Sequence, residues 1–539
     1  MRSLERQLIT AELRQRSEEG CDVHEISSRV EAALANKSSN ADLVKLYDEL
    51  MTLPIDPSFP YSEPSGLDDI RIQRPTAQRR TAFNFGDDVL YDRIYGAWLG
   101  RAAGCALGKP VEGWTKERID KLLAQSNALP LDNYLPFDAQ RFSANLKAST
   151  RDHIEYMDRD DDMDYMILAL LALEKTGPAF SSRGMASTWI NNISYGALYT
   201  AESSAYRNFV LGILPPESGI YRNPFREWIG AQIRADVFGY VTPGWPERAA
   251  ELAFRDAAIS HDKNGIYGEM FVAAMVAAAF VQDSAEAIIE AGLGEIPENS
   301  RLSEAVRNTL GWCKEEPYWE ATWEKINLTL GHYPGVHTIN NAALVVMGVW
   351  YGESDFEAGI VNTLRSGWDT DCTCATVGSI LGAKMGAKLL PKKWVGVLND
   401  RLLSAVRGHS DNQISELAQR TFDVIASLAK PENATVGSNK TAENSSLGGV
   451  WELDTGWGMQ RLDLTRGTIE FLSHHKGDQG PIELSSHQYS NPEFTYSFGI
   501  DKGGWDFAAD FSGTADGDSL EGFYYPTETP VRGRRISNK

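Results

Sequence analysis

Two short acidic segments carry the residues best suited to metal-dependent chemistry. Asp160, Asp161 and Asp162 are consecutive, and Asp369 and Asp371 are separated by one residue. Adjacent carboxylates repel one another, and divalent cations with oxygen ligands relieve that repulsion. Each segment precedes a long apolar run, so each could instead be a solvated helix cap. Together the two segments supply enough carboxylates for two cations about 3.5–4 Å apart.

A glycine-rich segment places a further carboxylate just after the predicted end of a helix. Gly104 and Gly108 would allow tight helix packing, and the Lys109-Pro110 break that follows would turn Glu112 away from the helix. A carboxylate that is not consumed by metal ligation can act as general acid or base. The structural alternative is an exposed Glu112 that pairs with Lys109 or Lys116.

A polar turn around a histidine is the fourth candidate. His261 precedes a segment punctuated by Gly265 and Gly268, which leads into an apolar run. Exposed backbone N–H groups at such a turn can hold a phosphate or a ribose. We therefore expect this segment to line a substrate cleft, the alternative being a structural histidine that caps a turn.

Helices must position these residues. Between about Phe83 and Ala429 the pattern is helical almost throughout, and four long apolar runs lie at 163–173, 266–280, 340–350 and 375–390. Their length and alanine content favour buried helices over strands. Gly378, Gly382 and Gly386 recur every four residues and would form a smooth helix face where another backbone can come close. Pro391 is expected to end that run.

The pattern divides the chain into four segments. Residues 1–82 predict an extension of short amphipathic helices with an irregular linker from Pro54 to Thr81. Residues 83–430 predict an all-helical domain, and 431–449 a flexible polar linker. Residues 450–539 alternate aromatic and β-branched residues with turn signals, which predicts a small antiparallel β-domain, a sandwich or a barrel. Its aromatic residues could bind a sugar or a protein, although such residues more often form a core.

Composition excludes several classes of function. The 539 residues are 42% hydrophobic and carry a net charge of -22, so a large core is possible and binding of nucleic acid through a basic surface is not expected. Five scattered cysteines indicate neither a disulfide framework nor structural zinc. The sequence has no membrane span and no apolar stretch typical of a secretion signal, so we expect a cytoplasmic protein.

Taken in order, the four motifs resemble the ADP-ribosylglycohydrolase family, of the dinitrogenase-reductase-activating and ADP-ribosylarginine or ADP-ribosylserine hydrolase type. The matching stretches are 104–112, 160–162, 261–268 and 369–372, within roughly residues 84–429. Cys105 and Cys372 depart from the family pattern, in which an acidic residue and a threonine stand. The metal trio of the second motif could be 159–161 or 160–162.

The resemblance implies an all-α fold with two Mg²⁺ ions, or Mn²⁺, at the bottom of a cleft that takes an ADP-ribosyl group. It implies that the aspartates of the two acidic segments hold the metals, that Glu112 is catalytic, and that His261, Gly265 and Gly268 lie near the substrate. The expected activity is hydrolysis of a glycosidic bond between an ADP-ribosyl or related ribosyl group and a protein side chain or small molecule. Two alternatives stay open: a non-catalytic ADP-ribose-binding scaffold and a two-metal phosphohydrolase.

Overall fold

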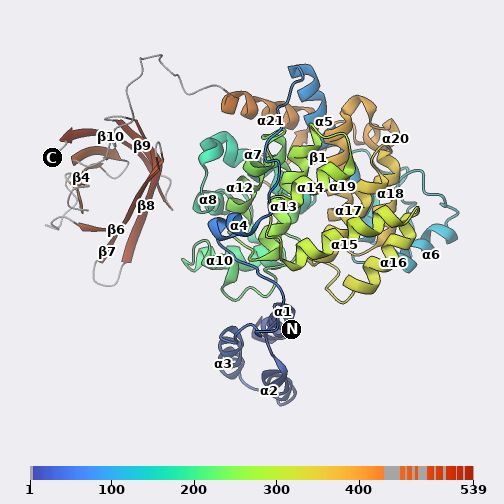
Figure 1. The fold of residues 1–539 in the computed structure, drawn as a ribbon, viewed down its shortest axis with the longest axis horizontal. Coiled ribbons are helices and arrows are strands. Elements are labelled where there is room, and N and C mark those ends of the chain that lie inside the picture. Colours follow the sequence, from blue (N-terminus) through green and yellow to red (C-terminus); the bar gives the residue numbers. More distant parts are fainter. Residues whose placement is uncertain are drawn as a thin grey trace. The chain divides into compact units, whose positions relative to one another are not determined.

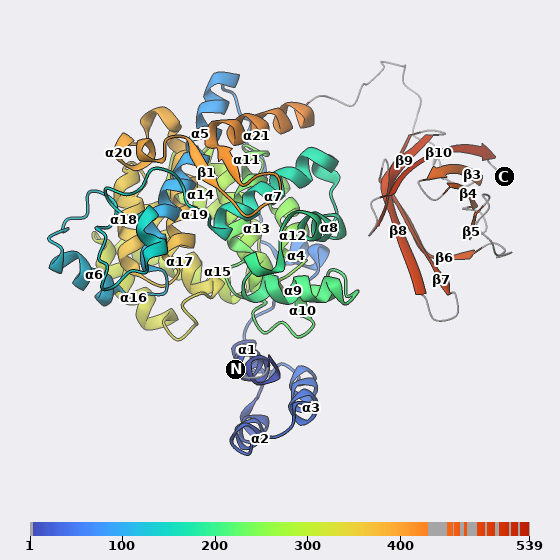
Figure 2. The ribbon, with the colours of Figure 1, turned by 180° about the vertical axis from the view of Figure 1, so that it is seen from behind.

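The computed structural model describes residues 4–429 and, further on, 450–455, 458–463, 468–471, 482–490, 493–501, 506–516, 519–525 and 529–537. The chain separates into two compact units, 1–430 and 431–539. In its described part the first unit is helical apart from a two-stranded antiparallel sheet of β1 (Arg401–Leu403) and β2 (Asp411–Gln413). The second is built of strands (Figures 1 and 2). The linker predicted at 431–449 lies outside the described residues.

The α-helices of the first unit follow one another along the chain. They are α1 (Leu4–Glu18), α2 (His24–Ala35), α3 (Asn40–Met51), α4 (Leu67–Gln73), α5 (Asp87–Gly108), α6 (Lys116–Gln125), α7 (Asp161–Thr176), α8 (Ser182–Asn192), α9 (Thr200–Val210), α10 (Glu217–Ile220), α11 (Asp236–Tyr240), α12 (Pro246–Ala257), α13 (Asn264–Ala279), α14 (Ala285–Leu293), α15 (Arg301–Glu315), α16 (Trp319–Leu330), α17 (Thr338–Tyr351), α18 (Phe356–Ser366), α19 (Thr370–Met385), α20 (Lys392–Val395) and α21 (Ile414–Ala429).

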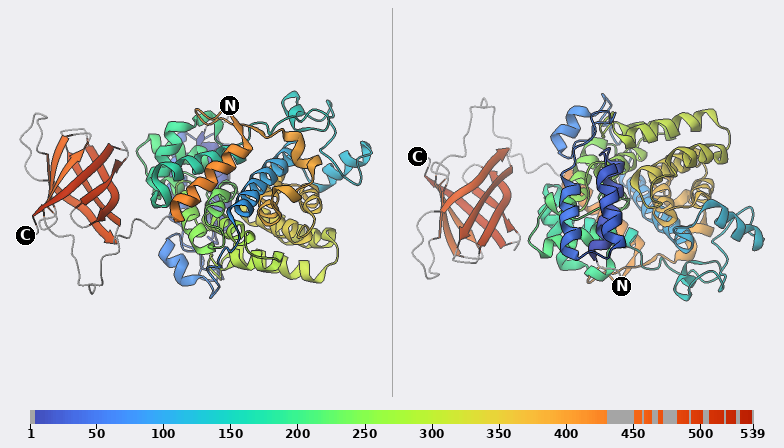
Figure 3. Two further views of the ribbon diagram at one scale, coloured as in Figure 1. Left: turned by 90° about the horizontal axis from the view of Figure 1, so that it is seen from above. Right: turned by 90° about the horizontal axis from the view of Figure 1, so that it is seen from below.

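Helices α1, α2 and α3 form the N-terminal extension (Figure 3, right). Their apolar faces meet in a small core that includes Leu8, Leu43 and Leu50, which confirms the amphipathic helices predicted for this part. The segment from Pro54 to Thr81 is not irregular throughout, because α4 lies within it. Ile70 anchors α4 by full burial in the main core, a tertiary contact that the polar local sequence does not reveal.

Helices α7, α13, α17 and α19 correspond to the four predicted apolar runs, and most of their residues are buried. This confirms the prediction of central helices in a mainly α fold. Helix α19 ends at Met385 rather than near Pro391, because Gly386 adopts a φ of 81°, a left-handed conformation that favours glycine and stops the helix. No helix in the described part of the chain is long and apolar enough to cross a membrane.

Helices α5 and α19 run antiparallel with their backbones in direct contact. A Cβ atom added to Gly100 would overlap the carbonyl of Gly378, and one added to Gly378 would overlap the carbonyl of Gly100. The same contact recurs at Gly104 and at Gly108, which faces the Thr370 carbonyl at the start of α19. The predicted close approach at the α19 glycine face is therefore confirmed, and its partner is the glycine row of α5.

The C-terminal unit contains β3 (Val450–Thr455), β4 (Gly458–Asp463), β5 (Thr468–Phe471), β6 (Ile482–Ser490), β7 (Glu493–Asp501), β8 (Asp506–Asp516), β9 (Ser519–Tyr525) and β10 (Thr529–Ser537). Neighbouring strands pair antiparallel, and β10 pairs with β3 to close a barrel. Trp451, Leu453, Leu462 and Phe511 are buried, as expected for the core of a small β fold. The predicted antiparallel β fold is confirmed.

The contact between α5 and α19 predicts a specific sensitivity to one methyl group. Gly100→Ala is expected to lower the free energy of unfolding by about 1–3 kcal/mol, because overpacking against a backbone cannot be relieved by a rotamer change. Gly311→Ala is the matched control, since Gly311 lies within α15 and has no atom within 4 Å of an added Cβ. That change is expected to be neutral or to stabilise by up to about 1 kcal/mol. Thermal unfolding of both variants measures the difference, and equal stability would contradict the close contact.

Candidate metal centre and substrate cavity

Three helix ends meet at the acidic residues. Helix α5 ends at Gly108, and a single 3-10 turn, Lys109–Val111, leads to Glu112. Asp160 is the N-cap of α7, where its carboxylate accepts a hydrogen bond from the Asp162 backbone N–H at 3.2 Å. Asp369 is the N-cap residue of α19. The glycine contact places the first and third of these ends together, since Gly108 touches Thr370.

A cavity of about 570 Å³ opens at this junction. Its walls include Glu112, Asp160, Asp161, Asp369 and Asp371, which the sequence places up to 259 positions apart. The structure thus brings the predicted catalytic carboxylate and four of the five predicted metal ligands to one cavity. Such a concentration of carboxylates is suited to divalent cations with oxygen ligands.

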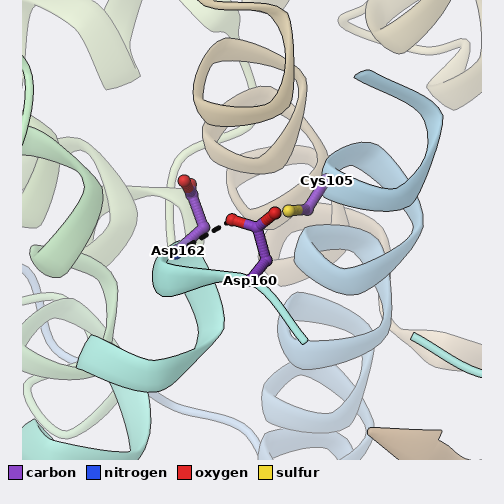
Figure 4. Close-up of side chains that lie close together, drawn as sticks. All are labelled: Cys105, Asp160 and Asp162. Carbon is purple, nitrogen blue, oxygen red and sulfur yellow. Dashed lines mark hydrogen bonds between the residues drawn. The ribbon is translucent and has the colours of Figure 1, made fainter. Parts of the chain in front are cut away.

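Three overlapping clusters of side chains have the spacing of a metal site. They are Glu112 with Asp369 and Asp371; Asp162 with Asp371 and Cys372; and Cys105 with Asp160 and Asp162. Within each cluster the candidate ligand atoms lie within 4.8 Å of one another. Figure 4 shows the third cluster, in which the Asp160 carboxylate lies between Asp162 and the Cys105 sulfur. Asp162, which is not a cavity wall residue, therefore belongs to the same group.

Burial and mutual repulsion perturb these carboxyl groups. Loss of hydration raises the pKa of Asp371 well above its usual value, and the nearby Glu112 and Asp369 charges raise it further. Burial likewise raises the pKa of Asp369 to about 6. One oxygen of Asp371 is buried without a hydrogen-bond partner among the described residues. A bound cation would supply the missing partner and offset the repulsion.

Asp162 is held by two side chains from other helices. The Arg101 guanidinium, fully buried on α5, donates to one carboxylate oxygen at 3.0 Å, and the Cys372 thiol donates to the other at 3.2 Å. Burial raises the pKa of the Cys372 thiol well above its usual value, and neighbouring aspartates raise it further, so the thiol is a neutral donor. Cys372 orients a carboxylate in this arrangement.

Glu112 lies at the cavity lip, and neither lysine considered as its partner pairs with it. Lys109 contacts Asp158 at 3.1 Å and Asp160 at 3.5 Å, while Lys116 pairs with Asp120. Loss of hydration raises the pKa of Glu112 to about 7; the charges of Asp369 and Asp160 add to the effect, and Lys109 opposes it. A carboxyl group that titrates near neutral pH can both donate and accept a proton.

His261, Gly265 and Gly268 are not brought into the cavity wall. His261 is buried, with Nδ1 2.8 Å from the Ser260 hydroxyl and Nε2 3.8 Å from the Glu202 carboxylate. An added Cβ at Gly265 would overlap the Arg226 carbonyl, and one at Gly268 would overlap the Thr338 side chain. These glycines allow close packing around α13, and a direct substrate contact from this turn stays a prediction.

Sequence reasoning missed several residues of the cavity wall. Glu202 on α9 is buried, accepts from Arg234 at 2.9 Å, and packs against Gly230, where any side chain would collide with its carboxylate. Burial raises the pKa of Glu202 to about 6, and Arg234 opposes that rise. Trp228 also lines the cavity. These residues stand in stretches with no acidic run or glycine spacing, so no local pattern marks them.

Comparisons with known proteins give three findings. The sequence model of the family described as ADP-ribosylglycohydrolase matches residues 86–431. An uncharacterized protein of Archaeoglobus fulgidus is 25% identical over 340 residues, which cover 62% of this chain and 96% of that protein. A solved structure described as an ADP-ribosylglycohydrolase-related protein complex has 18% sequence identity and a TM-score of 0.45, over 63% of this chain and 99% of that one.

The crowding of carboxylates predicts a cation response that depends on Asp371. Mg²⁺ or Mn²⁺ is expected to raise the melting temperature by about 2 °C or more, because a ligand that binds only the folded state stabilises it. In EDTA, Asp371→Asn should melt at or above the wild-type temperature, since one buried repelling charge is removed. The cation-induced rise should be lost. Asp423→Asn, at an exposed position on α21, is the control and should keep the rise. An unchanged response of Asp371→Asn would contradict the metal centre.

Proposed function

The chain belongs to the ADP-ribosylglycohydrolase family, and on that premise we propose that it is a metal-dependent hydrolase of an ADP-ribosyl or related ribosyl group. The bond cleaved is the glycosidic bond at the anomeric carbon, and the leaving group is a protein side chain or a small molecule. The observation that supports this function most directly is the meeting of Glu112 with the two acidic segments at one cavity.

We assign the metal ligands to Asp160, Asp161, Asp162, Asp369 and Asp371, and the ions to two Mg²⁺ or Mn²⁺. The donor set fits hard cations, because it consists of carboxylates and includes a buried oxygen without a partner. When bound, such ions would hold ribose hydroxyls and lower the pKa of a bound water.

Arg159 supports the choice of 160–162 as the metal trio. Its guanidinium pairs with Asp164 at 2.8 Å and donates to the Ala197 carbonyl at 2.7 Å. A guanidinium has no lone pair to offer a cation and stays charged in proteins. Arg159 therefore acts as a positive group beside the centre, where it can offset the charge of an anionic substrate.

Glu112 is the acid–base group of this proposal. Its side chain lies at the exposed edge of the centre, with a pKa raised toward neutrality by desolvation and by neighbouring carboxylates. As positive charge develops at the anomeric carbon, this carboxyl can give a proton to the leaving group or take one from the attacking water. The aspartates are worse suited to proton transfer, because ligation engages their lone pairs.

The role of Glu112 predicts a loss of rate without a loss of structure. Glu112→Gln is expected to lower kcat by at least about a hundredfold, because an amide cannot exchange the proton. The melting temperature should not fall, and its rise with Mg²⁺ should persist. Glu117→Gln, an exposed neighbour on α6, is the control and should keep full activity. Wild-type turnover by Glu112→Gln would refute the assignment.

Product analysis separates the proposed hydrolase from the two alternatives. The protein is incubated with Mg²⁺ and an ADP-ribosylated peptide, and in parallel with free ADP-ribose. Release of ADP-ribose from the peptide supports the glycohydrolase. Formation of AMP would instead indicate a phosphohydrolase, and binding of ADP-ribose without any turnover would indicate a scaffold.

A further inference from the structure

One short segment of the cavity wall continues directly into contacts with the N-terminal extension. Trp228, Ile229 and Gly230 line the cavity, and the segment containing them lies between the short helices α10 and α11. The three residues immediately before them, Phe225 to Glu227, contact the extension: the first packs on its apolar core, and the other two bond to its polar side chains. A wall outside regular secondary structure depends on its neighbours for rigidity.

Arg226 is the strongest of these contacts. It is fully buried, and two carboxylates hold its guanidinium: Glu12 of α1 accepts two hydrogen bonds at 2.8 and 3.0 Å, and Glu19, directly after α1, accepts one at 2.8 Å. Both carboxylates are themselves buried. Removing one partner of a buried, hydrogen-bonded ion pair leaves an uncompensated charge, so losing these contacts is costly and the Arg226 side chain ties its segment to the extension.

Glu227 continues the same network. Gln15 of α1 donates to its carboxylate at 2.6 Å, and Arg301 donates to both carboxylate oxygens at 2.7 and 2.9 Å. Asn264 at the start of α13 donates at 2.8 Å. Helix α1 and two helices of the main domain therefore hold the residue that directly precedes Trp228.

Phe225 joins the extension core to the cavity by ring contact. It packs against the apolar core of α1–α3, and its ring lies 4.7 Å from the Trp228 ring in an edge-to-face arrangement. Beyond Trp228, the Ile229 N–H donates to the Val336 carbonyl at 2.9 Å, and Val336 is also a wall residue. Contacts thus run without interruption from the extension to the wall residues Trp228, Ile229 and Val336.

We infer that α1, with the residue that follows it, is a positioning element of the substrate cavity. Glu12, Gln15 and Glu19 hold the 225–230 segment so that Trp228 to Gly230 keep the shape of the wall. Glu12, Gln15 and Glu19 are not among the residues that line the cavity, so their effect on the wall passes through Arg226 and Glu227. For catalysis the inference rests on the proposed function, whereas for the wall itself it stands on the contacts alone.

Hydrogen exchange in the full-length chain tests the wall independently of activity. In Glu12→Gln, the Ile229 amide and its neighbours in 225–230 are expected to exchange at least about tenfold faster than in wild type, because the wall opens locally. Phe225→Leu should act in the same direction without leaving a buried charge unpaired. Glu49→Gln is the control, since Glu49 pairs with Arg29 on the exposed face of the same extension. Unchanged exchange in both wall variants would overturn the inference.

Steady-state kinetics tests the consequence for substrate. Glu12→Gln and Phe225→Leu should each raise KM about tenfold with kcat within about twofold. The rise in melting temperature with Mg²⁺ should persist, because neither substitution touches the acidic centre. Faster exchange with unchanged KM would show that the wall does not contribute to substrate binding and would overturn that part. If the wild type shows no turnover, the proposed function fails, and the exchange experiment still decides whether α1 holds the wall.

Discussion

The direct backbone contact between α5 and α19 is the constraint on which the candidate site depends. Helix α5 has a row of glycines without side chains, at positions 96, 100, 104 and 108. This row contacts Gly378, Gly382 and the carbonyls of the first turns of α19. Helices with ordinary side chains pack 8–10 Å apart. Closer approach brings Glu112, just after the end of α5, beside Asp369 and Asp371 at the start of α19. The glycines therefore set the distance between the acidic side chains, although they carry no reactive group themselves.

The same junction concentrates negative charge in a poorly hydrated place. Arg101 offsets part of that charge, because it bridges Asp162 and Asp236 inside the domain, and Lys109 offsets part at the cavity edge. The remaining carboxylates raise one another's pKa values, which means that the folded state holds them together against repulsion. An arrangement that opposes folding in the absence of a partner is typical of functional sites, and a bound divalent cation would offset the repulsion here.

Much of this could be predicted from the sequence, because its signals are local. Apolar runs of helical length predicted α7, α13, α17 and α19. Carboxylates at the start of two of these runs predicted the acidic residues of the candidate metal centre. What local patterns could not give is contact between distant segments. Glu202 and Trp228 reach the cavity through tertiary packing, and α4 forms because Ile70 is buried against the core. The turn at His261 has the residue types of a phosphate site, yet neighbouring protein atoms fill the space beside Gly265 and Gly268.

The cavity combines two kinds of construction, and the difference bears on how such a site can vary. Its acidic floor is fixed by the ends of long buried helices, where a change in position would disturb the whole core. Its wall around Trp228 is an irregular segment whose position depends on ion pairs and ring contacts with the extension. Changes in α1 can therefore reshape the wall while the floor stays in place. Under the proposed function, the floor would set the reaction type, and the wall, together with the extension that holds it, would select the leaving group.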